Sequence, residues 1–135
     1  MPSGDRHSVE QQTETLSRFI FDERNFSLSK LRPVPRAFYP PPDGSGTSAF
    51  VIDGLQEAEI WWIADNVVAK MSNRQPPPAR ADIQSAAVLS ARLTVVPDPK
   101  DHPRHVNICG WPTEKEKRLA IAQDLCAAAI LKLRN

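Results

Sequence analysis

The chain has little of several features that would reveal its class at once. Its 135 residues include two cysteines, five glycines and one tyrosine, and basic residues outnumber acidic ones by only 17 to 16. Two cysteines are too few for the disulfide framework of a small secreted domain, so we expect a reducing compartment. The balanced charge gives no overall attraction to nucleic acid or anionic lipid. The length suits one domain with its own hydrophobic core.

Long hydrophobic runs are also missing. No stretch approaches the roughly 20 apolar residues that a membrane-spanning helix needs. The N-terminal segment has no apolar core of signal-peptide length, and its acidic residues are atypical of a transit peptide. The sequence therefore predicts a soluble cytoplasmic protein with no membrane partner. Residues 1–14 are polar and aperiodic, and we expect a flexible tail there, followed by a single domain at 15–135.

Proline, in contrast, is abundant, with 13 residues that cluster at 33–42, 76–78 and 97–112. Because proline fixes φ and lacks a backbone N–H, these clusters separate the expected elements. Hydrophobic periodicity predicts strands at 16–21, 37–39, 48–52, 92–96 and 105–109, and helices at 53–71, 81–91 and from 113 through 133. The runs 37–39 and 48–52 are expected to form a hairpin. This order of elements predicts an α+β fold: a small, mainly antiparallel sheet covered by two or three amphipathic helices.

Helix ends carry further signals. Asp53 is the expected N-cap of the first helix, and Met71 closes its apolar face. Asp82 is the expected cap of the second helix. Thr113 and Glu116 have the spacing of a capping box at the start of the third.

The segment VVPDPKDHPRHVNICGW, residues 95–111, is the main candidate site. His102 and His105 titrate near neutrality and are candidate catalytic acid–base groups. Asp98 is placed to orient an imidazole, and Arg104 to hold an anion. The spacing of the histidines lacks the helical scaffold and glutamate of a zinc protease motif, so we predict no metal and no cofactor. The alternative interpretation is a solvated loop that the prolines stiffen.

Two other segments are candidates for binding. The turn 43–48 is rich in glycine and hydroxyl groups, with Ser48 as a ligand contact and Arg36 as a second anion holder; its alternative role is a simple turn. Trp61 and Trp62 are adjacent on the first helix, about 100° apart, so both cannot follow one core stripe. They are the predicted interaction surface for a protein partner, unless a wide core face takes both.

Basic residues alternate with phenylalanine in the N-terminal third, from Arg18 to Arg36. Single-stranded nucleic acid is bound by such mixtures of charge and stacking surface. The same phenylalanines are the large aromatics that a sheet core requires, and core packing is the alternative.

Two blocks resemble a group of small bacterial proteins that pair an AF-P…D…S block with a V-P-D-P…P-x-H-x-x-I block. The similarity spans most of residues 16–112. The matching positions are Ala37, Phe38, Pro40, Asp43, Ser48, Val96, Pro97, Asp98, Pro99, Pro103, His105 and Ile108. No activity is assigned to the group. The resemblance therefore implies a bacterial origin and an emphasis on His105 over His102, without a reaction.

Three functions remain open on this evidence. The first is a non-enzymatic binding or protein-interaction module that meets its partner through the tryptophan pair or through the extended proline-rich edge. The second is a small enzyme acting on a nucleotide or other phosphorylated substrate, with His105 as general acid or base. It requires the turn 43–48 and the loop 98–105 to face one cleft. The third is single-stranded nucleic-acid binding.

Overall fold

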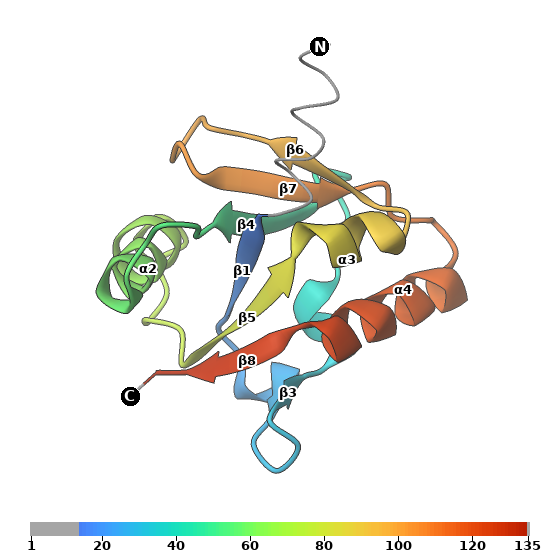
Figure 1. The fold of residues 1–135 in the computed structure, drawn as a ribbon, viewed down its shortest axis with the longest axis horizontal. Coiled ribbons are helices and arrows are strands. Elements are labelled where there is room, and N and C mark those ends of the chain that lie inside the picture. The colour runs from blue at the N-terminus through green and yellow to red at the C-terminus, as the bar shows by residue number, and fades with distance from the viewer. Residues whose placement is uncertain (1–13, 135) are drawn as a thin grey trace.

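The computed structural model describes residues 14–134 and shows an α+β fold. Its main sheet is antiparallel, with the strand order β6-β7-β4-β1-β5-β8 (Figure 1). The strands are β1 (Thr15–Ile20), β4 (Thr47–Val51), β5 (Ala79–Gln84), β6 (Thr94–Pro97), β7 (His105–Cys109) and β8 (Ile130–Leu133). A second, small sheet consists of β2 (Phe26–Ser27) and β3 (Arg32–Pro33).

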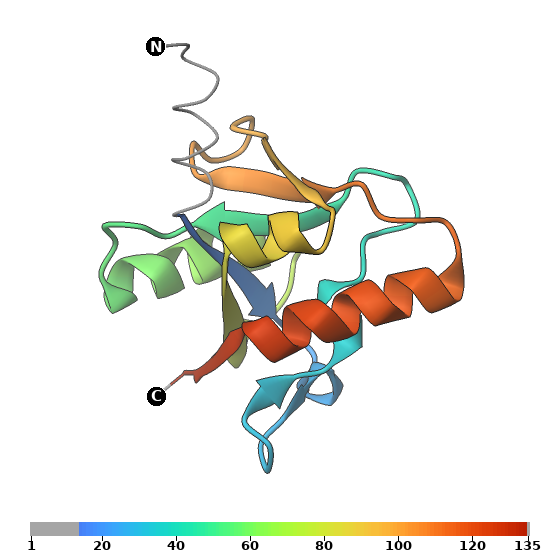
Figure 2. The same cartoon turned by 45° about the vertical axis from the view of Figure 1, so that its right-hand side comes forward.

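Helices cover both faces of the main sheet. The helical elements are η1 (Glu23–Asn25), η2 (Pro35–Phe38), α2 (Glu57–Ile63), η3 (Ala64–Ala69), α3 (Ser85–Ser90) and α4 (Lys115–Ala128). Figure 2 shows α3 and α4 together on one side of the strands and α2 apart from them. No helix among residues 14–134 is long and apolar enough to cross a membrane.

The alternation of side chains along the strands divides the core in two. Leu16 and Ile20 of β1 pack in a cluster with residues of η2, α3 and α4. Phe19 lies between them in sequence and packs with Phe50 and with α2 instead. Successive strand residues point to opposite faces, so a single run such as 16–21 supplies both clusters.

Most of the predicted strands are confirmed: 16–21, 48–52, 92–96 and 105–109 fall on β1, β4, β6 and β7. The strand predicted at 37–39 is wrong, because this stretch belongs to the 3-10 turn η2. Pro35 occupies its first position, where the fixed φ of proline favours a helical turn. The predicted hairpin is therefore also wrong, and β4 pairs with β1 and β7.

The helix predicted at 53–71 is confirmed but begins later, at Glu57. Asp53 is not its N-cap: the Asp53 carboxylate accepts a 2.8 Å hydrogen bond from the backbone N–H of Thr15. Gln56 caps the helix instead, and its N–H donates to Glu59 Oε1 at 2.9 Å, which completes a capping box. 

The same helix widens at η3 into a π-helical turn. A π-helical turn contains more residues than an α-helical turn, so the residues after it are rotated about the helix axis. The apolar face expected from α-helical spacing therefore does not continue to the end of the helix. Met71 is 62% exposed and therefore lies outside the core in which the sequence pattern placed it.

The helix predicted at 81–91 is wrong in its first half, which forms β5. Ala81 and Ile83 are buried on one face of this strand, whereas Arg80 and Asp82 lie on the other. Asp82 is consequently not a helix cap, and its carboxylate accepts from Arg80 Nε at 3.1 Å.

The last helix is confirmed only as far as Ala128, because residues 130–133 form the edge strand β8. The predicted capping box of Thr113 and Glu116 is wrong: the N-cap is Glu114, and no side-chain hydrogen bond caps the helix. The predicted flexible tail lies almost wholly outside the described residues and stays a prediction.

Candidate functional site

Ser48, His105 and Asp98 form a hydrogen-bonded chain. The Oγ of Ser48 lies 2.7 Å from Nε2 of His105. On the other side of the ring, Nδ1 lies 3.0 Å from the backbone oxygen of Asp98 and 3.4 Å from Oδ2 of its carboxylate. The structure thus brings together three of the residues that the sequence nominated, including members of the turn 43–48 and of the loop 98–105.

The surroundings of His105 favour one tautomer. The backbone oxygen and the carboxylate of Asp98 both face Nδ1, and both can only accept a hydrogen bond. Nδ1 is therefore the nitrogen that carries the proton in a neutral ring. Nε2 then has a free lone pair and accepts from the Ser48 hydroxyl. The Asp98 carboxylate is itself held by Asn107, whose Nδ2 donates to it at 3.1 Å. An imidazole oriented in this way can take a proton from a serine hydroxyl.

Two paired strands position the serine and the histidine. In the ladder between β4 and β7, Ser48 stands opposite Asn107, and Phe50 stands opposite His105. Ser48 and His105 are therefore diagonal neighbours on one face, close enough for their side chains to meet. Asp98 follows β6, and its N–H donates to the backbone oxygen of His105 at 2.9 Å, which closes the β6–β7 hairpin.

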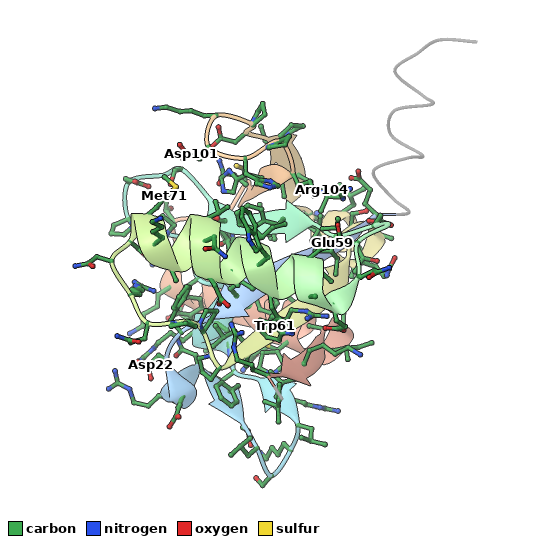
Figure 3. All side chains as sticks on the ribbon, turned by 90° about the vertical axis from the view of Figure 1, so that its left-hand side faces the viewer. Asp22, Glu59, Trp61, Met71, Asp101 and Arg104 are labelled. Atoms are coloured by element: carbon green, nitrogen blue, oxygen red, sulfur yellow. The ribbon has the colours of Figure 1, made fainter. Side chains whose placement is uncertain are left out.

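Two cavities meet at Ser48. One has a volume of about 410 Å³ and is lined by β1 and by the end of the helical segment; the other, of about 230 Å³, is lined by that segment and by Asp101 and His105. In Figure 3, Met71 and Asp101, which line the smaller cavity, lie near the left end of the helix. Asp22, which lines the larger cavity, lies below that end of the helix. Ser48 is among the residues that line both cavities.

The larger cavity opens where β1 and β4 separate. These strands pair at only two positions of β1, Leu16 and Ser17. The Arg18 side chain occupies the space beyond: Nη1 donates to the backbone oxygen of Ser48 at 2.9 Å, and Nε donates to that of Ala37 at 2.9 Å. A charged side chain thus replaces the ladder beside the candidate nucleophile.

His102 does not join His105 at Ser48. Its ring meets Phe50 edge-on at 5.7 Å between centroids, and its Nδ1 accepts from the backbone N–H of Arg104 at 3.1 Å. Burial lowers the pKa of His102, and the charges of Arg104 and His105 lower it further. His102 lines a different cavity, of about 420 Å³, near the start of the helix.

The two predicted anion holders also lie away from Ser48. Arg104 donates from Nη1 to the backbone oxygens of Val51 and Asp53, at 3.1 and 2.9 Å, and lines the cavity that contains His102. Arg36 is exposed on η2 and lines none of these three cavities.

The tryptophan pair divides between two environments. Trp61 lies between two guanidinium groups, with Arg80 at 4.9 Å and Arg134 at 4.4 Å from its ring. Trp62 is 57% exposed and lines the cavity with His102 and Arg104. Of the two, Trp62 is the one whose indole is exposed.

The sequence patterns did not predict that Arg18 and Arg74 line the larger cavity or that Asn107 holds Asp98. Arg18 belongs to the alternating basic and aromatic residues of the N-terminal third, but Phe19 and Phe38 of that series are buried in the core. Nothing local in the sequence separates Arg18 from its neighbours, because its role depends on the gap between two strands. Asn107 carried one available signal, since it shares a strand face with His105.

No group of three or more metal-ligating side chains is found among residues 14–134. Cys109 contacts the backbone oxygen of Ser45 at 3.7 Å, and burial raises the pKa of its thiol. Burial raises the pKa of the Cys126 thiol to about 12. Both cysteines are therefore protonated at neutral pH and poor nucleophiles.

No protein-family model matches this chain, and no curated protein or solved structure is significantly similar to it. The resemblance to the group of small bacterial proteins accordingly stays a prediction.

Proposed function

We propose that the protein is a small enzyme that cleaves an ester through Ser48, with His105 as general base and then general acid. The observation that carries this proposal is the 2.7 Å contact between Ser48 Oγ and His105 Nε2, with Asp98 on Nδ1. A serine that only filled a strand would not need an oriented imidazole and two adjoining cavities. The proposal keeps His105 as the acid–base group of the enzymatic alternative predicted from the sequence. It makes Ser48 the nucleophile, where the sequence suggested only a ligand contact, and it leaves His102, Arg104 and Arg36 outside the site.

The reaction uses groups that are already in contact. Ser48 Oγ forms a bond to the electrophilic centre of the ester while its proton passes to His105 Nε2. The bond from that centre to the leaving oxygen breaks, and the imidazolium returns the proton to the leaving alcohol. Water then attacks the serine ester and gives a proton to His105. The bond to Ser48 Oγ breaks, Oγ takes that proton back from His105, and the acid product leaves. Asp98 stabilises the imidazolium in both steps.

A covalent probe tests the nucleophile without knowledge of the substrate. We expect a fluorophosphonate to label the wild-type protein at Ser48, as located by peptide mass spectrometry. Ser48→Ala should abolish the label, and His105→Gln should slow labelling about a hundredfold or more, because general-base assistance is lost. Ser45→Ala removes an exposed hydroxyl of the same turn and serves as the control, which should label like the wild type. Labelling elsewhere, or equal labelling of His105→Gln, would contradict the proposal.

We propose partner binding as a second candidate function, carried by a different observation. Trp62 is 57% exposed. It lines the 420 Å³ cavity together with the apolar residues Leu55, Ala58 and Ile63. Arg104 and Glu59 at its margin add charges of both signs, and Figure 3 shows the two near each other by the helix. Exposed tryptophan in an apolar hollow is typical of an interface.

This second function is tested with a purified partner. A protein that is captured from cell extract, then purified, should bind the wild type and lose at least tenfold in affinity with Trp62→Ala. Leu28→Ala is the matched control, because Leu28 is a large apolar residue that is 64% exposed and does not line that cavity. Equal loss in both variants, or no loss in either, would exclude the Trp62 surface.

A further inference from the structure

Two arginines line the larger cavity without a carboxylate partner. Arg18 reaches the cavity from β1, and Arg74 reaches it from the segment after η3. None of the ion pairs formed within residues 14–134 includes either side chain. Two arginines without a carboxylate partner, in a cavity that Ser48 also lines, favour the binding of an anion.

Arg18 is held rigidly in place. Its Nε and Nη1 are both used by backbone oxygens, those of Ala37 and Ser48. Burial, together with repulsion from Arg74, lowers the pKa of Arg18 to about 10, so that the group is still charged at neutral pH. A cation that is withdrawn from water without a counter-ion costs free energy, and a bound anion would offset that cost.

Arg74 is oriented by an aromatic ring. Its guanidinium carbon lies 4.9 Å from the centroid of Phe21, a cation–π contact. Phe21 follows β1 and lines the same cavity. The two positive groups therefore approach one hollow from two directions, although like charges repel. 

One carboxylate also lies in the wall of this cavity. Asp22 is engaged by Arg24, whose Nη2 approaches Oδ2 at 2.7 Å and whose backbone N–H donates to Oδ1 at 2.8 Å. These hydrogen bonds lower the pKa of Asp22 to about 2. Because Arg24 already balances Asp22, the charges of Arg18 and Arg74 are left for a ligand.

We propose that Arg18 and Arg74 bind the phosphate group of the substrate, so that the ester cleaved at Ser48 is a phosphate monoester. This inference rests on the proposed function, because it takes Ser48 as the attacking group. Guanidinium groups pair with phosphate oxygens through charge-assisted hydrogen bonds, and two of them match a dianion. Arg18 contacts the backbone of Ser48 itself, so a phosphate held by Arg18 lies beside the serine.

The bond changes follow from that placement. Ser48 Oγ bonds to phosphorus, and the bond from phosphorus to the ester oxygen breaks. The proton that Ser48 gave to His105 goes to the departing alcohol. Water then bonds to phosphorus and displaces Ser48 Oγ, which recovers a proton through His105, and inorganic phosphate leaves. Arg18 and Arg74 stabilise the charge on the other phosphate oxygens throughout.

Binding of inorganic phosphate, the product of this reaction, provides the test. We expect titration calorimetry at constant ionic strength to show phosphate binding to the wild type. Arg74→Gln should weaken it about tenfold to a hundredfold, as expected when one charged hydrogen-bonding group is removed. Arg74 is exposed, so this variant should fold; Arg18→Lys keeps the charge but loses the planar group and should also bind weakly. Arg32→Gln removes an exposed arginine of β3, outside the cavity, and should bind like the wild type.

The outcomes separate this inference from the proposed function. If the wild type binds no phosphate at millimolar concentration, or if Arg74→Gln binds as well as Arg32→Gln, the phosphate site is overturned, whereas fluorophosphonate labelling of Ser48 would still support an esterase. If phosphate binds through the two arginines but Ser48 is not labelled, the phosphate site stands and the proposed chemistry fails. With both correct, p-nitrophenyl phosphate should be hydrolysed by the wild type and not by Ser48→Ala.

Discussion

Arg18 and Arg80 lie on neighbouring strands but differ in what surrounds their guanidinium groups. In the ladder between β1 and β5, Arg18 is paired with Ala81, one position from Arg80. Arg80 is 2% exposed, and its guanidinium binds Glu57 through two contacts of 2.7 and 2.9 Å. Arg18 meets backbone oxygens and a cavity, and no carboxylate among residues 14–134 pairs with it.

The difference separates a charge that carboxylates of the fold neutralise from one that no carboxylate among residues 14–134 pairs with. The Arg80 cluster is closed: Asp82 accepts from Nε at 3.1 Å, and the ring of Trp61 covers the guanidinium. All three guanidinium nitrogens of Arg80 donate to Glu57 or Asp82. At Arg18 the backbone supplies the hydrogen bonds that fix the group, but no carboxylate among the described residues 14–134 supplies a counter-charge. We therefore propose that Arg18, the fixed cation beside Ser48, is the one of the two that binds a ligand.

The largest effect is expected from Arg80→Met. This change leaves the buried Asp82 carboxylate without its partner, so we expect the free energy of unfolding to fall by about 3–5 kcal/mol. Chemical denaturation monitored by circular dichroism measures it. Phosphate binding per folded molecule should not change. A loss below about 1 kcal/mol would show that the Arg80 cluster is not the structural member of the pair.

Arg18→Met should cost less stability, about 1–2 kcal/mol. Two hydrogen bonds to backbone oxygens are lost, but no buried carboxylate is stranded and water can enter the cavity. Phosphate should raise the melting temperature of the wild type, because it binds only the folded state, and leave that of Arg18→Met unchanged. A phosphate-dependent shift of equal size in both proteins, measured by differential scanning calorimetry, would contradict the assignment.

Glu57→Gln should have a smaller effect, below about 1 kcal/mol, because the Glu57 side chain is 65% exposed and solvent screens the pair. Hydrogen bonds from Arg80 lower the pKa of Glu57. Its contribution is therefore present above the unfolded-state pKa near 4.5 and is lost as the pH falls through the lower, folded-state value. Denaturation curves of the wild type and Glu57→Gln should converge in acid. Divergence in acid would contradict this sign.

The smallest effect is expected at His102. Burial and the neighbouring Arg104 and His105 lower its pKa, so the unfolded chain takes up the proton first. Its contribution to stability is thus present above pH 6.5 and declines as the pH falls from there to the folded-state pKa. Titration by NMR should place the His102 midpoint below 6.5, and His105→Gln should move it upward. A midpoint above 6.5 would contradict the burial of the His102 ring and the effect of the neighbouring Arg104.

Local patterns predicted the elements that are supported by near neighbours. The alternation in HVNIC correctly marked β7, and the apolar spacing after 53 correctly marked a helix. They failed where partners distant in sequence decide the outcome. Ala79–Gln84 is a strand because β1 and β8 flank it, and 130–133 leaves the helix to pair with β5. Tertiary pairing overrides a weak helical preference.

The candidate site shows the same division. By itself the sequence determined which loop carries acid–base groups, because histidine and aspartate between two apolar runs are visible without a fold. Only the tertiary structure decided that Ser48, 57 residues before His105, is its hydrogen-bond partner, and that Arg18 lies beside both. The physical reason is register: that 2.7 Å contact depends on how β4 is aligned with β7, and a shift of one residue would turn the serine to the other face of the sheet.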